Sequence, residues 1–320
     1  MTQPFHRRQF LTGTAAVAGA WALNGAQARD LPAAERESTG SLRFCLNTST
    51  IRGQGLSLNE EIELVAEAGY DGIEPWIREI QEHRESGGSL RDVAKKCADH
   101  GLVIPSAIGF ATWIVNDPAE RARGLEQAKR DMDLVQQIGG LRIAAPPAGA
   151  TQDEQVIDLF AAAERYAALL EIGANMGVTP QVEVWGFSKN LSRLGETAFV
   201  AIESGHPDAC ILPDVYHIYK GGSDLAGIKL LGREAIHCFH LNDYPAYPPR
   251  AEIGDADRVY PGDGVAPLEQ ILGDLVANHC QCMLSLELFN QAYWEQDAAT
   301  VVRDGLASMK RSLAMVVTQP

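Results

Sequence analysis

Four residues in the second half of the chain have side chains that can bind a metal ion, and each lies near the end of an apolar segment. Glu183 lies in QVEVW, Asp214 ends LPD, His240 lies in CFHLND, and Glu287 lies in LSLEL. A single histidine or carboxylate at such a position is more often a core residue or a helix cap than a ligand. Successive members are separated by about one βα unit, which favours a shared site.

A shared site would bring three carboxylates and one imidazole together among apolar residues. Buried carboxylates repel one another and lose hydration, so a cation is needed to neutralise them. Oxygen-rich ligation with one nitrogen suits a divalent ion, and we predict Mn²⁺, with Mg²⁺, Co²⁺ or Zn²⁺ as alternatives. Such an ion polarises a carbonyl group and stabilises an enediolate, while Glu183 and Glu287 take or return the proton. Transfer on one face gives isomerisation, and transfer on opposite faces gives epimerisation.

The elements that must position these residues alternate regularly between short apolar segments and amphipathic helices. This alternation predicts parallel strands joined by crossover helices, and eight such units favour an α/β fold of the (β/α)8 TIM barrel type. The predicted strands are 42–47, 71–74, 102–107, 141–145, 181–184, 210–212, 236–241 and 283–288. The predicted helices are 58–68, 89–100, 118–138, 154–176, 194–203, 225–231, 267–276 and 298–315.

A doubly wound open sheet is the alternative architecture. Such a sheet usually has a glycine-rich phosphate-binding turn after its first strand. The segment TSTIRG, which follows the first predicted strand, lacks this pattern. We therefore prefer the barrel.

The composition is that of a large acidic domain. The chain has 320 residues, 46% of them hydrophobic, and a formal charge of −15. This length and hydrophobic content support a sizeable core. Because no run of Lys or Arg follows the first few residues, the electrostatic field repels nucleic acid and anionic membranes. Neutral or metal-chelated small molecules are better suited to such a chain.

The first 28 residues have the features of an export signal. Arg7 and Arg8 precede a short apolar run, and AQA at 26–28 has the small-x-small form of a cleavage site. The segment resembles a twin-arginine signal, and its apolar run is too short to span a bilayer well. We predict a periplasmic protein with a signal at 1–28, a linker at 29–40 and a single barrel domain at 41–320.

The six cysteines do not suggest a disulfide framework or a structural zinc site. Cys45, Cys210 and Cys238 lie in apolar runs and are expected to be small buried residues. Cys280 and Cys282 lack a second pair of Cys or His at zinc-site spacing.

The four candidate ligands and their neighbours resemble a known family. Glu183, Glu287 and the segments DVYH at 214–217 and HLND at 240–243 are similar to those of the xylose isomerase-like superfamily of sugar isomerases and epimerases. The segments DRVYPGDG at 257–264 and SLELF at 285–289 are similar to the 2-keto-myo-inositol (inosose) isomerase branch. The resemblance implies one divalent metal held by Glu183, Asp214, His240 and Glu287. It also implies that Glu183 and Glu287 act on opposite faces of a bound sugar.

Four further residues are candidates for substrate binding. The resemblance places His217 at a position that contacts substrate oxygen, and a bond to the backbone is the alternative. Glu74 can receive a sugar hydroxyl or pair with an arginine. Arg258 can reach the substrate or anchor its loop to a nearby aspartate. Trp185 follows a predicted strand, where aromatic rings often line a sugar pocket, although ordinary packing is also common.

Three functions remain open. The first is a metal-dependent isomerase or epimerase of a keto sugar or cyclic polyol ketone. The second is a lyase on the same scaffold, which would eliminate a β-substituent from an inosose or a 3-keto glycoside. The third is a non-catalytic periplasmic sugar-binding protein, although binding alone requires neither Glu183 nor Glu287.

Two features depart from the inosose isomerase pattern. Inositol catabolism is expected in the cytoplasm, which conflicts with an export signal. Asn242 stands where many relatives have Lys in an H-x-K-D segment, so a cation near the metal is missing. We expect a sugar or cyclitol as the partner, no nucleic acid, and no stable membrane association after signal cleavage. The sequence leaves open whether the chain forms a homo-oligomer.

Overall fold

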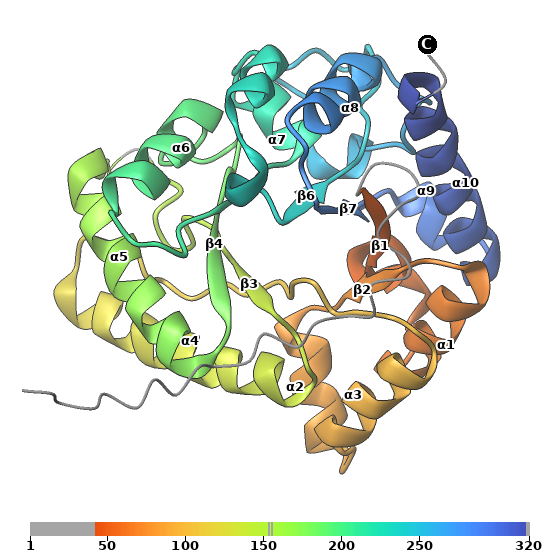
Figure 1. The fold of residues 1–320 in the computed structure, drawn as a ribbon, viewed down its shortest axis with the longest axis horizontal. Coiled ribbons are helices and arrows are strands. Elements are labelled where there is room, and N and C mark those ends of the chain that lie inside the picture. Colours follow the sequence, from red (N-terminus) through yellow and green to blue (C-terminus); the bar gives the residue numbers. More distant parts are fainter. Residues whose placement is uncertain (1–41, 153, 155, 318–320) are drawn as a thin grey trace, which may run out of the picture. The chain divides into compact units, whose positions relative to one another are not determined.

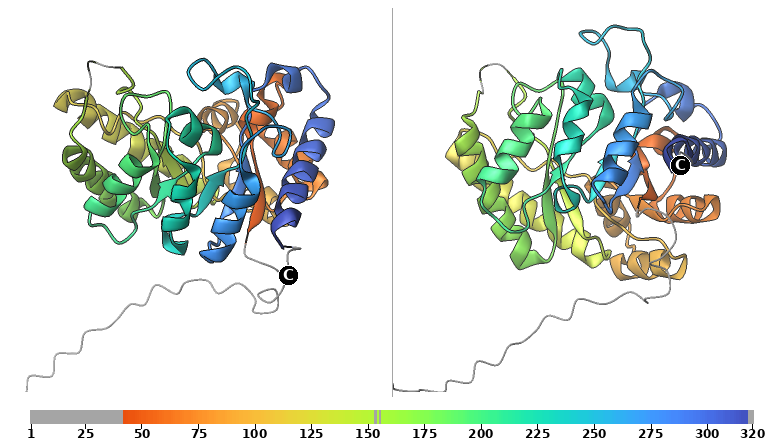
Figure 2. Two further views of the ribbon diagram at one scale, coloured as in Figure 1. Left: turned by 90° about the horizontal axis from the view of Figure 1, so that it is seen from above. Right: turned by 45° about the horizontal axis from the view of Figure 1, so that its top comes forward.

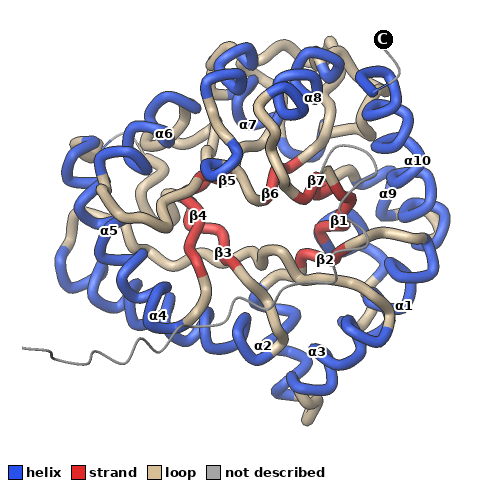
Figure 3. Tube along the Cα trace, viewed as in Figure 1, coloured by secondary structure: helices blue, strands red, loops and turns tan. Residues whose placement is uncertain are grey.

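The computed structural model describes residues 42–152, 154 and 156–317. The predicted signal and linker lie outside these residues. Within the described part, short parallel strands form a ring, and helices lie on its outer side (Figure 1, Figure 3). The two further views in Figure 2 show the same arrangement. The strands are β1 (Arg43–Asn47), β2 (Gly72–Glu74), β3 (Arg142–Ala145), β4 (Thr179–Glu183), β5 (Ile211–Leu212), β6 (Cys238–His240) and β7 (Met283–Leu286).

Two regular parallel sheets make up most of the ring. Their strand orders are β2-β1-β7-β6 and β3-β4-β5. Isolated parallel bridges join β5 to β6, one between Ile211 and Ile236 and one between Asp214 and His240. On the other side, residues 103–108 connect β2 to β3. The predicted TIM barrel is therefore confirmed.

The third predicted strand, 102–107, is not a regular strand. Val103 forms a parallel bridge with Gly72 of β2, whereas the N–H of Ala107 donates to the carbonyl of Arg142 in β3. Pro105 lies between these contacts and has no N–H, so an uninterrupted ladder cannot form here. The segment occupies the third strand position with fewer hydrogen bonds than a strand would make.

Helices and 3-10 turns follow the strands. The helices are α1 (Leu58–Ala68), α2 (Ile77–Glu85), α3 (Leu90–Asp99), α4 (Pro118–Gln137), α5 (Leu159–Met176), α6 (Leu194–Glu203), α7 (Val215–Lys220), α8 (Leu268–Ala277), α9 (Gln291–Trp294) and α10 (Ala298–Val317). The 3-10 turns are η2 (Thr48–Gln54), η4 (Leu225–Leu230), η5 (Arg233–Ala235) and η6 (Asp255–Asp257). Among the described helices, none is long and apolar enough to cross a membrane.

The helix boundaries correct several predictions. The helix predicted to begin at Glu154 begins at Leu159, because the side chain of Asp158 accepts hydrogen bonds from the first-turn amides. The segment predicted as a helix at 225–231 is the 3-10 turn η4. Helices α2, α7 and α9 were not predicted, and each begins within five residues of a strand end.

The core has two parts, on the two faces of the strands. A small buried cluster contains alternate strand residues, including Cys45 of β1, Leu212 of β5 and Cys238 of β6. The much larger cluster contains the intervening strand residues, such as Leu46 and Phe239, and the apolar faces of the helices. All six cysteines are free and buried.

Candidate active site

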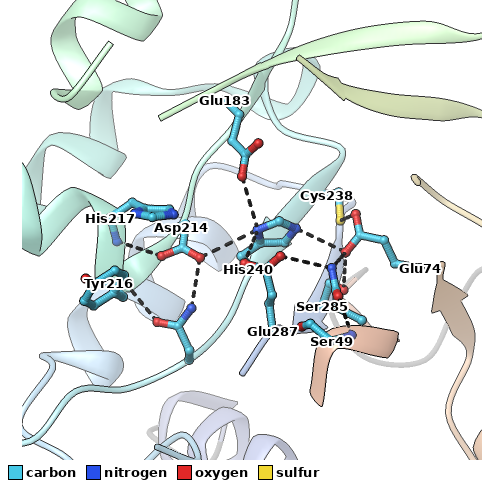
Figure 4. A network of polar contacts seen from close by, with 12 residues as sticks. Ser49, Glu74, Glu183, Asp214, Tyr216, His217, Cys238, His240, Ser285 and Glu287 are labelled. Atoms are coloured by element: carbon cyan, nitrogen blue, oxygen red, sulfur yellow. Dashed lines mark hydrogen bonds and ion pairs between the residues drawn. The ribbon is translucent and has the colours of Figure 1, made fainter. Parts of the chain in front are cut away.

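Side chains from four successive strand positions converge at the carboxyl ends of the strands (Figure 4). Glu183 and His240 are the last residues of β4 and β6, Asp214 follows β5, and Glu287 follows β7. The Nδ1 atom of His240 lies 3.2 Å from Oε2 of Glu287, 3.6 Å from Oδ2 of Asp214 and 3.9 Å from Oε1 of Glu183. All four residues are buried. The structure thus brings together the four residues that the sequence predicts as ligands.

The arrangement fits a divalent ion. Nδ1 of His240 and Oε2 of Glu183 are buried and have no hydrogen-bond partner among the described residues. Atoms that ligate one ion at roughly 2.1 Å lie about 3 to 3.5 Å apart, close to the distances around Nδ1. Asp214, His240 and Glu287 form one group whose atoms could hold an ion together.

The electrostatics of these side chains also favour a cation. Burial lowers the pKa of the His240 imidazole, but the carboxylates of Glu287 and Glu74 outweigh this effect and raise it well above its usual value. Burial raises the pKa of Glu183 well above its usual range. His240 opposes this rise, and the charges of Glu287, Asp214 and Glu74 add to it. The site therefore has more negative charge than its own cations neutralise.

Glu74 fixes His240 through the other ring nitrogen. Oε2 of Glu74 lies 3.1 Å from Nε2 of His240 and accepts hydrogen bonds from Asn47 Nδ2 at 3.0 Å and Ser285 Oγ at 2.6 Å. Although burial raises the pKa of Glu74, His240 and these donors lower it to about 2. A carboxylate that accepts from one ring nitrogen of a histidine leaves the other free to ligate a metal. The predicted arginine partner of Glu74 is not found among the described residues, and its geometry fits a positioning residue behind His240.

Asp214 has two roles that the sequence treats as alternatives. Its Oδ1 accepts a hydrogen bond from the N–H of His217 at 2.7 Å and so caps α7. Its Oδ2 faces His240 and accepts from Asn242 Nδ2 at 2.9 Å. The Oδ1 of Asn242 accepts from the N–H of Tyr216 at 3.0 Å. Asn242, which brings no charge, therefore holds Asp214 against α7.

Arg258 is a fully buried cation beside these residues. Its Nη1 donates to Glu287 Oε2 at 2.8 Å and to Asp214 Oδ2 at 3.1 Å. Its Nη2 contacts Asp255 and lies 3.0 Å from Nε2 of His217. Arg258 thus anchors its own loop, as one prediction proposed, and also lies against two candidate ligands.

Asp243 fixes the loop that carries Arg258. Its two carboxylate oxygens accept hydrogen bonds from four backbone amides, two of them the N–H groups of Gly262 and Gly264 at 3.0 Å. Gly262 has φ 91°, a conformation that L side chains rarely adopt. A Cβ on Gly264 would lie 2.3 Å from Oδ1 of Asp243. The glycines of PGDG are therefore required for this loop to close on Asp243.

His217 and Trp185, the other two predicted substrate-binding residues, lie beside the site. The N–H of Gly186 lies 3.3 Å from Nδ1 of His217. Burial is the main reason that the pKa of His217 is lowered to about 4. Trp185 follows β4 and packs against Phe110 and Phe187.

Sequence reasoning missed Asn47 and Ser285. Asn47 Nδ2 bridges Oε2 of Glu74 at 3.0 Å and Oε1 of Glu287 at 3.2 Å. Its Oδ1 accepts from the indole Nε1 of Trp76 at 2.9 Å. An amide at the end of the first strand is the only available sequence signal, because the contact residues are 27 and 240 positions away.

A closed barrel with an acidic site of the metal-binding type at the carboxyl ends of its strands is the organisation of TIM-barrel enzymes. The chain belongs to the xylose isomerase-like TIM barrel family, whose sequence model matches residues 62–312.

Relatives with assigned activities fall into two groups. A 3-dehydroshikimate dehydratase of Pseudomonas aeruginosa is 29% identical over 261 residues, which cover 79% of this chain and 39% of the relative. The chain thus spans about two fifths of that relative. An inosose isomerase of Bacillus velezensis is 24% identical over 267 residues, which cover 82% of this chain and 94% of the relative.

A solved structure confirms the fold. The crystal structure of IOLI protein with a binding zinc atom superposes with a TM-score of 0.80 at 19% identity, over 87% of this chain and 100% of that chain.

Proposed function

We propose that the protein is a divalent-metal-dependent isomerase or epimerase that moves a proton next to the carbonyl group of a keto sugar or a cyclic polyol ketone. The observation that carries this proposal is the position of Glu183 and Glu287, whose carboxylates approach His240 from opposite sides (Figure 4). Two carboxylates beside one candidate metal group provide a base on each side of a bound substrate.

The residues have distinct roles in this proposal. Glu183, Asp214, His240 and Glu287 would hold the ion, and the ion would supply Lewis-acid polarisation of the substrate carbonyl. Glu183 has a carboxylate oxygen without a protein partner, so it is available to exchange a proton with substrate. Asn47 and Arg258 hold Glu287 in position. Mn²⁺ remains the ion that we predict, and Zn²⁺, the ion in the IOLI structure, is the main alternative.

A dehydratase is the second candidate, and the relative from Pseudomonas aeruginosa favours it. Proton removal next to a carbonyl is also the first step of β-elimination, so the same residues would serve both reactions. Under either reaction, the predicted twin-arginine signal leads us to propose that the protein works in the periplasm. An exported enzyme fits an extracytoplasmic keto sugar better than inosose.

Solvent exchange tests the proposed chemistry. The purified protein is incubated with Mn²⁺ and a panel of keto sugars and inososes in D₂O. We expect a substrate to incorporate deuterium at the carbon next to its carbonyl group, and NMR measures this incorporation. Glu183→Gln and Glu287→Gln should each lose exchange, whereas Glu203→Gln, an exposed glutamate of α6, should retain it. Wild-type exchange in both active-site variants would refute the mechanism.

The products distinguish the candidate functions. An isomerase or epimerase converts the ketone into an isomer of equal mass, whereas a dehydratase releases water and gives a product lighter by that mass. Mass spectrometry of the reaction mixture separates these outcomes. Binding of a sugar without exchange at any carbon would favour the non-catalytic binding protein.

A further inference from the structure

Aromatic rings form a continuous circuit beside the candidate active site. The ring contacts, with their centroid distances, are Phe289 to Trp76 at 6.0 Å, Trp76 to Phe110 at 5.1 Å, Phe110 to Trp185 at 6.0 Å, Trp185 to Phe187 at 5.1 Å, and Phe187 to His217 at 5.6 Å. Arg258 closes the circuit, because its guanidinium lies 5.0 Å from the ring centroid of Phe289 and 3.0 Å from Nε2 of His217. We call these six rings the aromatic collar.

The collar adjoins the metal-type site rather than a separate surface. Its rings all follow the carboxyl ends of strand positions of the barrel, where TIM-barrel substrates bind. Arg258, which closes the collar, also donates to Asp214 and Glu287. Trp76 is linked to Glu287 through Asn47. A molecule held by the candidate ligands therefore lies next to the rings.

Polarity changes sharply between the site and the collar. Glu183, Asp214 and Glu287 are at most 4% exposed, whereas Phe110 and Phe187 are 42% and 47% exposed. These two phenyl groups lie on either side of Trp185 and offer no polar atom to a ligand. Exposed aromatic rings next to buried charged residues favour a ligand-binding surface.

The collar is held in place by close packing. The N–H of Trp185 donates to the carbonyl of Leu191 at 2.9 Å. A Cβ on Gly186, which lies between Trp185 and Phe187, would be 2.2 Å from the carbonyl oxygen of His217. On the other side, the guanidinium of Arg52 stacks 3.8 Å from the ring centroid of Trp76. These contacts fix the backbone at Trp185 and the ring of Trp76, so this part of the surface loses little conformational entropy when a ligand binds.

We propose that the substrate carries an aromatic group attached to its keto sugar, and that Phe110, Trp185 and Phe187 bind this group. This inference rests on the proposed function, which places the carbonyl end of the substrate at the candidate metal residues. The inference concerns the other end of the same molecule. Phe110 and Phe187 offer no hydrogen-bond partner to the hydroxyl groups around the ring of a bare keto sugar, so these groups gain no hydrogen bond there. A flat apolar group gains by stacking on both. The substrate class is therefore an aryl glycoside of an oxidised sugar.

A matched pair of ligands tests this inference. The phenyl and methyl glycosides of 3-keto-glucose share the sugar and differ only in the group that would reach the collar. The phenyl compound is expected to bind the Mn²⁺-loaded protein at least about tenfold more tightly than the methyl compound in calorimetry. The double variant Phe110→Ala with Phe187→Ala should reduce this ratio to about one. Phe160→Ala, at a phenylalanine of α5 that is 59% exposed, should leave the ratio unchanged.

The outcomes separate this inference from the proposed function. Equal affinity for the two glycosides, or no binding of the phenyl compound at millimolar concentration, would overturn the aromatic assignment. Deuterium exchange is measured on the same samples. Exchange without a phenyl preference would support the proposed function and reject the inference. A phenyl preference that depends on Phe110 and Phe187, without exchange into any ketone, would support the inference and reject the proposed chemistry.

Discussion

Replacing Glu74 by glutamine should weaken metal binding without changing the fold. Glu74 lies behind His240, and its Oε2 accepts from Asn47 and Ser285 as well as contacting Nε2 of His240. A glutamine oxygen at the same place can keep all three contacts. Because the pKa of Glu74 is lowered to about 2, the native side chain is charged at neutral pH. Glu74→Gln therefore removes the charge and retains these three contacts.

The size of the effect follows from the geometry. An ion on Nδ1 of His240 would lie roughly 7 Å from the carboxylate of Glu74, across the imidazole ring. Charges of −1 and +2 at that distance attract by about 1 to 5 kcal/mol for an effective dielectric constant between about 80 and 20. Outer carboxylates behind metal-bound histidines contribute about 10-fold to 100-fold in metal affinity, which is within this range. We therefore expect Glu74→Gln to bind metal about 10-fold to 100-fold more weakly than the wild type.

Calorimetric titration of the metal-free protein with Mn²⁺ and Zn²⁺ measures the change. Asp71→Asn is the matched control, because Asp71 precedes β2, accepts from the N–H of Phe44 at 2.8 Å, and lies about 10 Å along the strand from Glu74. The control variant removes the same charge and should bind metal like the wild type. A dissociation constant for Glu74→Gln within twofold of the wild-type value would show that the carboxylate does not act through His240.

Two further predictions concern stability. Asp131 of α4 is buried, and burial raises its pKa from 3.8 to about 6. The folded protein therefore loses stability as the pH rises from about 4 to about 6, and this contribution stays constant above that pH. Asp131→Asn should increase the free energy of unfolding at pH 7 by up to about 3 kcal/mol and not at pH 3.5, whereas the exposed Asp133→Asn should have little effect in urea denaturation at either pH. Arg258→Met should cost about 3 to 5 kcal/mol in the same assay, because it leaves the buried carboxylates of Asp214 and Glu287 without their cation. A cost below about 1 kcal/mol would mean that these carboxylates do not depend on Arg258.

The architecture could be predicted from the sequence because its signals are local. Pro118 begins α4 as predicted, with Asp117 as its cap, and Gly177 ends α5 in the left-handed conformation. The third strand position could not be predicted in detail. Its backbone hydrogen bonds alternate between residues on the β2 side and residues on the β3 side, with an interruption at Pro105, so this pairing depends on both neighbours in the closed ring rather than on local sequence.

The candidate site also has residues that could be predicted from the sequence and residues that could not. Glu183, Asp214, His240 and Glu287 could be predicted to meet because each carries a distinctive chemical group at the carboxyl end of a strand. Asn47 and Ser285 could not, because an amide or hydroxyl in an apolar strand has no unique chemical meaning. Their importance comes from contacts made in the folded chain: both donate to the carboxylate of Glu74, and Asn47 also donates to Glu287.

The segment HLND has a different significance once its contacts are known. Asn242 brings no cation, yet Oδ2 of Asp214 has a cationic partner in Arg258 at 3.1 Å. The guanidinium reaches this position because the loop that carries it closes on Asp243, through the amides of Gly262 and Gly264. Two neighbouring residues therefore act together: Asn242 positions Asp214 directly, and Asp243 positions the arginine that neutralises it. A change in the loop at 257–264 should alter the charge balance at the candidate metal residues even where no ligand is changed.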